Sequence, residues 1–202
     1  MVSDTRAPGA EPERLTAERF LSLVREGVLS ERDRVELLNG VVVAMAPSNP
    51  RHAAAVAKAA EVLQSSLRGR AAVRCQLALV LGERSVPEPD VAVVPGQNDH
   101  YVRSHPRTAL LVVEVSDWSL GQDRITKAAV YATAGIPEYW IVNLRDDRVE
   151  VRRDPDATRG LYRSECFFQR GESIELAAFP GASVAVEALL PGSETEPSSG
   201  SM

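Results

Sequence analysis

The first residue whose type conflicts with its surroundings is Glu114, which interrupts the apolar run LLVVEV at residues 110–115. The run is predicted to be a strand that is buried on both faces. An isolated carboxylate in such a strand costs several kcal/mol unless it is paired, protonated or bound to a metal ion. The alternative is an edge strand whose outer face is in water at this position.

A second acid, Asp90, opens the neighbouring run PDVAVV at residues 89–94. If the two runs pair as antiparallel strands with Asp90 opposite Glu114, Val94 lies opposite Leu110 and both carboxylates lie at one end of the sheet. A divalent cation would relieve their repulsion, and oxygen ligands suit Mg²⁺ or Mn²⁺. The alternative is that Asp90 only forms a turn, a common role for a Pro-Asp pair.

Glu36 is a third acid in a strand-like segment, Val35-Glu36-Leu37-Leu38. Strand alternation points its side chain away from those of Val35 and Leu37. On its own, such a residue is more typical of a solvated face. The three acids form an oxygen-ligand set only if the fold brings them together.

Lysine is rare in this chain: the 23 basic residues include only two lysines, Lys58 and Lys127. Lys127 follows Asp123 by four residues on a predicted helix, a spacing that is compatible with a surface ion pair. The functional alternative is that this helix carries Lys127, and Tyr131 one turn later, over the acids. An ammonium group there orients a metal-bound water and offsets phosphate charge. Lys58, among alanines, is predicted to be solvated.

The three histidines do not have zinc-ligand spacing with one another or with a cysteine. His52 follows Pro50 at the start of a predicted helix, where it is either a polar residue of the first turn or a residue that faces the site. His100 and His105 are predicted to lie in a loop.

The order of predicted elements is typical of a mixed α/β domain with a central, largely covered sheet. Helices are predicted to begin at Thr16 and at Asn49-Pro50, with a hairpin turn at Asn39-Gly40 between them. A third helix is predicted over about 122–134, with Ile125 on its apolar face. Strands are predicted at AVRCQLALVL, PDVAVV, ALLVVEVS, EYWIVN and RVEVRR, and near 161–168, 172–176 and 183–186.

Composition indicates one domain over residues 15–191, between segments 1–14 and 192–202 that are predicted to be disordered. The net charge of −5 argues against a protein that coats nucleic acid through a broad basic surface, but not against a local basic patch.

No apolar run approaches the ~20 residues that cross a bilayer, and no secretion signal is expected. Cys75 and Cys166, far apart, are predicted to be reduced thiols of a cytoplasmic protein.

Taken in order, these residues resemble the Uma-type restriction endonuclease family of the PD-(D/E)xK nuclease superfamily. The resemblance covers roughly residues 15–155 and is carried by an ordered set of motifs: VELLNGV, His52 after a proline, Pro89-Asp90, VVEVS, D-x-x-x-K-x-x-x-Y and GIPEYWIV. It implies a restriction-endonuclease-like core, in which helices flank a central mixed β-sheet, and a Mg²⁺-dependent cut of phosphodiester bonds.

On that resemblance, Asp90, Glu114 and the backbone carbonyl of Val115 hold the metal ion, and Glu36 is a further ligand or holds a water. The superfamily places its lysine two residues after the glutamate, where this chain has Ser116. The Uma-type pattern takes the lysine from the following helix, and Lys127 matches it. Two other departures are Asp117-Trp118, in place of a segment that typically contains proline, and Asn143, in place of the usual Asp.

Two functions follow as hypotheses. The first is a metal-dependent endonuclease with Glu36, Asp90, Glu114 and Lys127 as catalytic residues, supported by His52 and Tyr131. Its substrate is expected to be nucleic acid, in particular DNA. The sequence is compatible with a homodimer, the commonest oligomer, but does not decide the oligomeric state. Phosphate-binding candidates are Arg51, Arg74 and Arg124. The alternative is an inactive module that keeps the fold to bind nucleic acid or protein.

Overall fold

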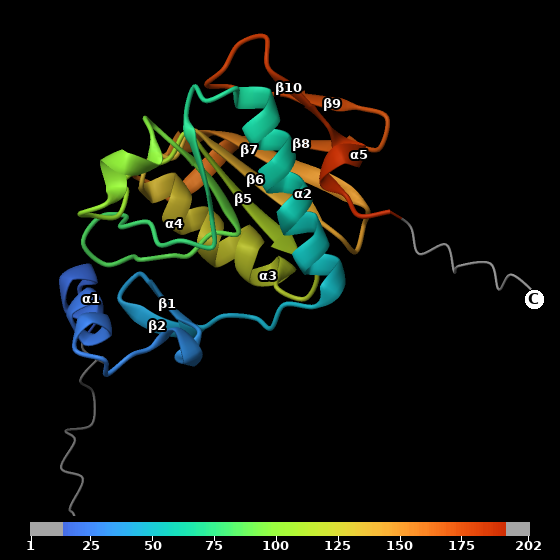
Figure 1. Cartoon of the computed structure of the whole chain (residues 1–202). Helices are drawn as coiled ribbons and strands as arrows, with labels where there is room; N and C mark the ends of the chain where they lie inside the picture. The colour runs from blue at the N-terminus through green and yellow to red at the C-terminus, as the bar shows by residue number, and fades with distance from the viewer. Residues whose placement is uncertain (1–13, 193–202) are drawn as a thin grey trace, which may run out of the picture.

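A six-stranded mixed sheet forms the centre of the computed structural model, which describes residues 14–192 (Figure 1). The strands lie in the order β3-β4-β5-β6-β7-β8; β5 and β6 are parallel, and all other neighbours are antiparallel. Their bounds are Ala72–Cys75, Val91–Val94, Leu111–Ser116, Glu138–Asn143, Arg148–Asp156 and Leu161–Gln169. The predicted mixed α/β fold with a central sheet is therefore confirmed. Except for residues 14 and 192, the segments predicted to be disordered lie outside the described residues.

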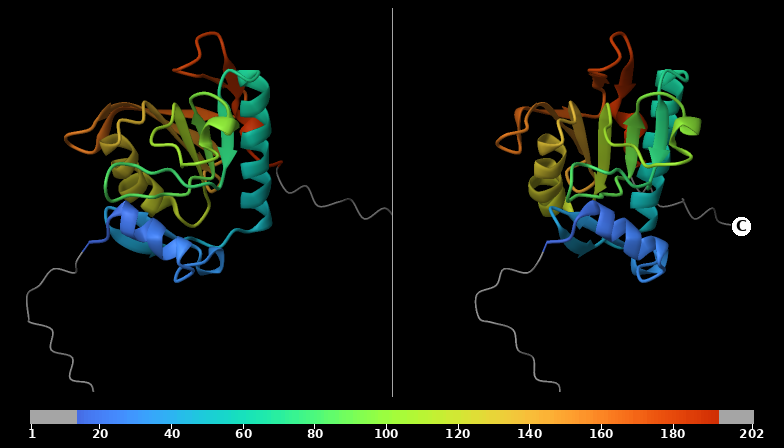
Figure 2. Two further views of the ribbon diagram at one scale, coloured as in Figure 1. Left: turned by 60° about the vertical axis from the view of Figure 1, so that its left-hand side comes forward. Right: turned by 90° about the vertical axis from the view of Figure 1, so that its left-hand side faces the viewer.

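Helices cover both faces of this sheet, as the edge-on view in Figure 2 shows. On one face, α2 (Pro50–Leu67) packs Ala59, Leu63 and Leu67 against Val113 and Trp140 of the sheet. The short helix α5 (Val186–Leu189) and the hairpin of β9 (Ser173–Glu175) and β10 (Ser183–Ala185) complete this layer.

The other face is covered by one continuous helical stretch, made of α3 (Leu120–Gln122), a π-helical turn η3 (Asp123–Lys127) and α4 (Ala128–Thr133). Here Tyr131 of α4 packs against Tyr139 of β6, with ring centroids 5.0 Å apart. Because both faces of β5 are buried, the apolar run around Glu114 does not alternate with polar residues.

A small unit at the N-terminal end lies against one end of the sheet (Figures 1 and 2). It contains α1 (Ala17–Arg25), capped by the side chain of Thr16, and the hairpin of β1 (Val35–Leu38) and β2 (Val41–Ala44). The predicted turn at Asn39-Gly40 is confirmed. Both residues have positive φ angles, 50° and 81°, which is the backbone that a two-residue hairpin turn requires.

The sequence predicts that AVRCQLALVL is one strand. This prediction is wrong, because β3 ends at Cys75. Gln76 has a φ angle of 49°, which breaks the extended conformation. Residues 77–81 then run across to the proline-containing segment opposite, where the Leu79 amide donates to the Pro87 carbonyl. The ladder cannot continue there because prolines 87 and 89 have no amide hydrogen to donate.

The prediction that Ile125 belongs to a buried apolar stripe is wrong, because the residue is 73% exposed. It lies within the π turn η3, which has a wider turn than an α-helix and changes the direction in which each side chain points. The sequence did not predict the helix α5.

No helix within residues 14–192 has both the length and the apolar composition that crossing a membrane requires.

Glu138 of β6 is a fully buried carboxylate that joins the sheet to the β9 region. It accepts hydrogen bonds from the indole nitrogen of Trp140 at 3.0 Å, from the guanidinium of Arg153 at 2.6 and 3.0 Å, and from the amide of Ala177 at 2.9 Å. The Arg153 side chain is 31% exposed and can turn to water, but loss of the carboxylate would leave the fully buried indole nitrogen of Trp140 without an acceptor.

We therefore expect Glu138→Ala to lower the free energy of unfolding by about 2–3 kcal/mol in urea denaturation. Glu165→Ala is the matched control, since Glu165 pairs with Arg152 at 2.8 Å but its side chain is 42% exposed. That change is expected to cost at most about 1 kcal/mol. Equal effects of the two substitutions would contradict a structural role for the buried pair.

Candidate functional site

The register between β4 and β5 places Asp90 beside Glu114. Val91 lies opposite Val113 and Val93 opposite Leu111, which is the pairing that the sequence predicts. Asp90 directly precedes β4, and its Oδ2 accepts a hydrogen bond of 2.8 Å from the amide of Val115. The edge-strand alternative for Glu114 is wrong, because β5 lies between β4 and β6.

Lys127 and Tyr131 reach Glu114 from the helical layer above the sheet. The Lys127 Nζ lies 3.0 Å from Glu114 Oε1, and the Tyr131 hydroxyl donates to the same oxygen at 2.6 Å. The alternative of a surface ion pair between Asp123 and Lys127 is wrong, since these residues are only 2% and 8% exposed. The sequence spacing D-x-x-x-K-x-x-x-Y therefore marks one face of the helical stretch that is turned toward the sheet.

Glu36 arrives from the N-terminal hairpin. Its Oε1 lies 3.4 Å from the Lys127 Nζ, and its Oε2 accepts a hydrogen bond of 3.2 Å from the amide of Glu88. The expectation for Glu36 alone, a solvated face, is wrong because the residue is buried. Two backbone hydrogen bonds between Leu37 and Val86 hold β1 in this place.

His52 lies in the first turn of α2 and faces the site rather than solvent. Its Nε2 is 3.2 Å from Asp90 Oδ2. The hydrogen bond to Asp90 raises the pKa of His52, against the lowering effect of burial, and the carbonyl of Val115 adds to the increase. His52 thus contacts two of the three groups that the family resemblance assigns to a metal ion.

Acids outnumber bases in this buried space. Burial raises the pKa of Glu114 to about 8; Lys127 opposes the shift, and the charges of Asp90, Asp123 and Glu36 add to it. For Lys127, burial lowers the pKa, but the carboxylates of Glu114, Glu36 and Asp123 outweigh it, so the net shift is upward. One ammonium group is therefore shared among several carboxylates.

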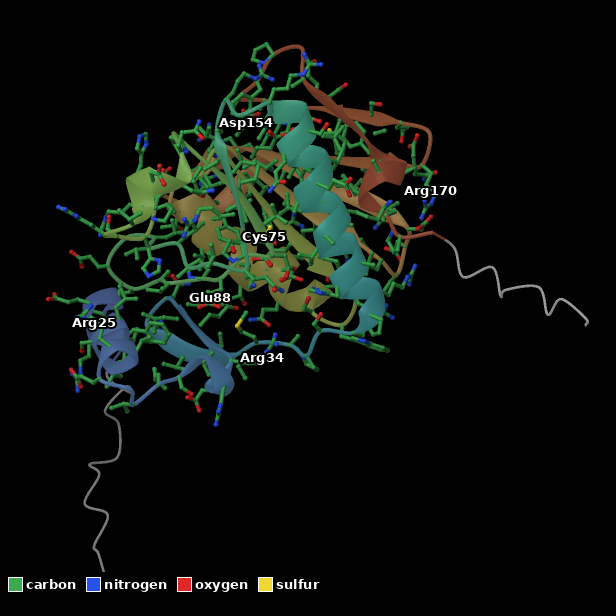
Figure 3. The ribbon with its side chains drawn as sticks, viewed as in Figure 1. Arg25, Arg34, Cys75, Glu88, Asp154 and Arg170 are labelled. Atoms are coloured by element: carbon green, nitrogen blue, oxygen red, sulfur yellow. The ribbon has the colours of Figure 1, made fainter. Side chains whose placement is uncertain are left out.

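A cavity of about 50 Å³ lies between these side chains. Its lining contains eight residues that the sequence did not assign to the site: Arg34, Met45, Ala46, Gln76, Glu88, Ser119, Gln122 and Asp123. Figure 3 places Arg34 and Glu88 where the hairpin meets the body of the protein. The D-x-x-x-K spacing could have identified Asp123. Gln76, whose amide donates to Asp90 Oδ1 at 3.5 Å, had no signal because it lay within a supposed strand.

The donors around this cavity fit a hard cation such as Mg²⁺. Among residues 14–192, no group of three or more His, Cys, Asp and Glu side chains is arranged to hold one metal ion. Mg²⁺ does not need such a group, since it is commonly bound by one or two carboxylates and retains several waters. Asp90, Glu114 and the Val115 carbonyl supply oxygen atoms, and the cavity has room for a few water-sized particles.

The three arginines predicted to bind phosphate occupy different places. Arg124 makes a two-pronged ion pair with the buried Glu150 of β7, at 2.9 and 2.5 Å. Arg74 on β3 stacks its guanidinium over the ring of Tyr101. Arg51 is partly buried in the first turn of α2, next to His52. None of the three lines the site cavity as the structure describes it.

Comparisons with known proteins bear on the family and the fold of this chain. A family model, Uma2, described as "Putative restriction endonuclease", matches residues 17–187. Among solved structures, the chain is similar to a putative nuclease belonging to DUF820 from Anabaena variabilis, with a TM-score of 0.69 at 17% sequence identity. The similarity covers 87% of this chain and 97% of that one. A search of the curated proteins gave no match.

The structural neighbour supports the fold, and the family model supports membership over most of the chain, including all four predicted catalytic residues. The chain belongs to the Uma2 family of putative restriction endonucleases.

Proposed function

We propose that this protein is a metal-dependent nuclease that hydrolyses phosphodiester bonds in nucleic acid, in particular DNA. The observation that carries the proposal is the meeting of Asp90, Glu114 and Lys127 at one end of β4 and β5, from three separate elements. A site in which buried carboxylates outnumber the basic side chains is a common arrangement for holding a divalent cation.

In this proposal, Asp90, Glu114 and the Val115 carbonyl hold Mg²⁺ or Mn²⁺, and Glu36 holds a water or acts as a further ligand. When bound, such an ion polarises the scissile phosphate and lowers the pKa of a bound water. The Val115 amide fixes the Asp90 carboxylate, and the Tyr131 hydroxyl fixes that of Glu114. Both carboxylates are thus oriented before any ligand arrives.

Lys127 would act as a donor and a positive charge rather than as a base. The neighbouring carboxylates raise its pKa, so the ammonium group keeps its proton at neutral pH. An ammonium group near a phosphate orients the attacking water and offsets the negative charge that develops in the transition state.

The second candidate is an inactive module that keeps the fold as a binding scaffold. The net charge of −5 favours this candidate if the partner is a basic protein. It predicts that Asp90 and Glu114 can be replaced with little effect on metal binding, which separates it from the nuclease.

Titration calorimetry of Mn²⁺ tests the metal centre without knowledge of the substrate. We expect wild-type protein to bind Mn²⁺ and Asp90→Asn to lose this binding, because the amide keeps the shape of the side chain but removes its charge. Glu165→Gln, an exposed carboxylate change on β8, is the control and should bind as wild type. If neither wild type nor Asp90→Asn binds at millimolar metal, the scaffold is the better explanation.

Cleavage under single-turnover conditions tests the role of the lysine. Lys127→Ala is expected to lower the rate by roughly 10²- to 10³-fold, the usual cost of removing one preorganised donor that faces developing negative charge. The other lysine of the chain provides the control, since Lys58 lies on α2 and does not line the site cavity as described. Lys58→Ala should cleave at the wild-type rate. Unchanged cleavage by Lys127→Ala would exclude the assigned role.

A further inference from the structure

Trp118 is an exposed tryptophan at the mouth of the candidate site. It lies between the end of β5, which carries Glu114, and the start of α3, and its side chain is 77% exposed. The other tryptophan of the chain, Trp140, is fully buried and bonded to Glu138. An indole ring with most of its surface in water has given up the burial that normally stabilises this residue type.

Trp118 lies next to the cavity of the candidate site. Trp118 borders a small recess of about 20 Å³. Three other residues of that recess, Ala46, His52 and Ser119, also line the cavity that contains Asp90 and Glu114. A ligand that enters the site from this side therefore passes the indole ring.

Hydrogen bonds on both sides hold the segment that carries Trp118. The Asn49 side chain donates to Asp117 Oδ2 at 2.7 Å, and Asn49 Oδ1 also accepts from the amide of His52 at the start of α2. On the other side, the Ser119 hydroxyl donates to Asp123 Oδ2. The indole is thus presented from an anchored segment.

The surroundings of Trp118 favour a polar ligand with an aromatic face over a protein partner. The other residues of the recess are Ala46, Pro47, Asn49, His52, Asp117 and Ser119, so within the described chain it contains no second large apolar side chain. A protein-binding hot spot typically combines an aromatic anchor with a desolvated apolar surround. A nucleobase can stack on the flat face of the ring alone, and this holds for every type of base.

Stacking on an indole requires a base whose face is free. In a continuous duplex both faces of each base are covered by its neighbours, whereas bases in single strands, flaps and frayed ends are accessible.

From these observations we propose that Trp118 stacks on an unpaired base next to the cleavage position, so that the substrate is nucleic acid with a single-stranded segment there. The proposal rests on the nuclease function above and narrows its substrate class. It assigns Trp118 a binding role, while Asp90, Glu114 and Lys127 keep the chemistry.

Intrinsic fluorescence is a suitable readout, because Trp140 is buried and only Trp118 can meet a ligand. We would titrate wild-type protein, in EDTA to prevent cleavage, with oligodeoxythymidine of about 12 nucleotides, within the range of known single-strand site sizes. A long blunt-ended duplex at equal nucleotide concentration would be titrated in parallel. We expect the single strand to quench the fluorescence and the duplex to leave it unchanged.

Substitutions separate stacking from general hydrophobic contact. By anisotropy of a labelled single strand, Trp118→Leu is expected to bind roughly 5- to 150-fold more weakly than wild type. Trp118→Phe should retain most of the affinity, because it keeps an aromatic face. Val102→Ala is the control, since Val102 is equally exposed at 78% and lines none of the site cavity as described.

The proposal is overturned if the single strand causes no quenching, or if Trp118→Leu binds it as tightly as wild type. It is also overturned if Trp118→Leu weakens duplex and single-strand binding equally. These results are distinguishable from failure of the nuclease function. Quenching without Mn²⁺ binding or cleavage would keep the stacking role and reject the enzyme, whereas cleavage of duplex that is independent of Trp118 would do the reverse.

Discussion

Several carboxylates share one ammonium group in the interior of this protein, and the arrangement of the surrounding elements depends on that contact. Lys127 lies within ion-pair distance of both Glu114 and Glu36, which come from the central sheet and from the N-terminal hairpin. Removing charges from water is costly, and it is tolerated only where the partners are held in good geometry. The helical stretch, the sheet and the hairpin must therefore meet at this point.

The hairpin is the least obvious part of this arrangement, because it is not a strand of the central sheet. Its strand β1 is held instead by the paired hydrogen bonds between Leu37 and Val86, on the segment that leads to Asp90. This contact positions Glu36 and also closes one side of the cavity, where Arg34 and Glu88 complete the lining. The site is thus built where the hairpin meets the sheet, and the hairpin contributes Leu38 to one apolar cluster and Leu37 to another.

Orientation of the carboxylates without a bound ion is a further consequence of the fold. Asp90 is held by the Val115 amide and by His52, and Glu114 by Tyr131 and Lys127. Arg124, three residues before Lys127, does not contact these carboxylates. Its guanidinium instead forms an ion pair with Glu150 of β7. Positive charge in this region serves mostly to hold acids in place, which agrees with a chain that carries more acids than bases.

The sequence by itself determined the sheet core and one helix face. Apolar β-branched runs define β4 and β5, and the spacing of Asp123, Lys127 and Tyr131 defines the helix face, whereas the sequence allowed but did not require the register that brings Asp90 beside Glu114. Only the tertiary structure decided that Glu36 is buried, that Ile125 is exposed and that β3 ends at Cys75. These outcomes depend on contacts between residues far apart in the chain, or on a π turn and a positive φ angle. Local spacing and propensity do not encode such features, because the free energy that sets them comes from packing against distant elements.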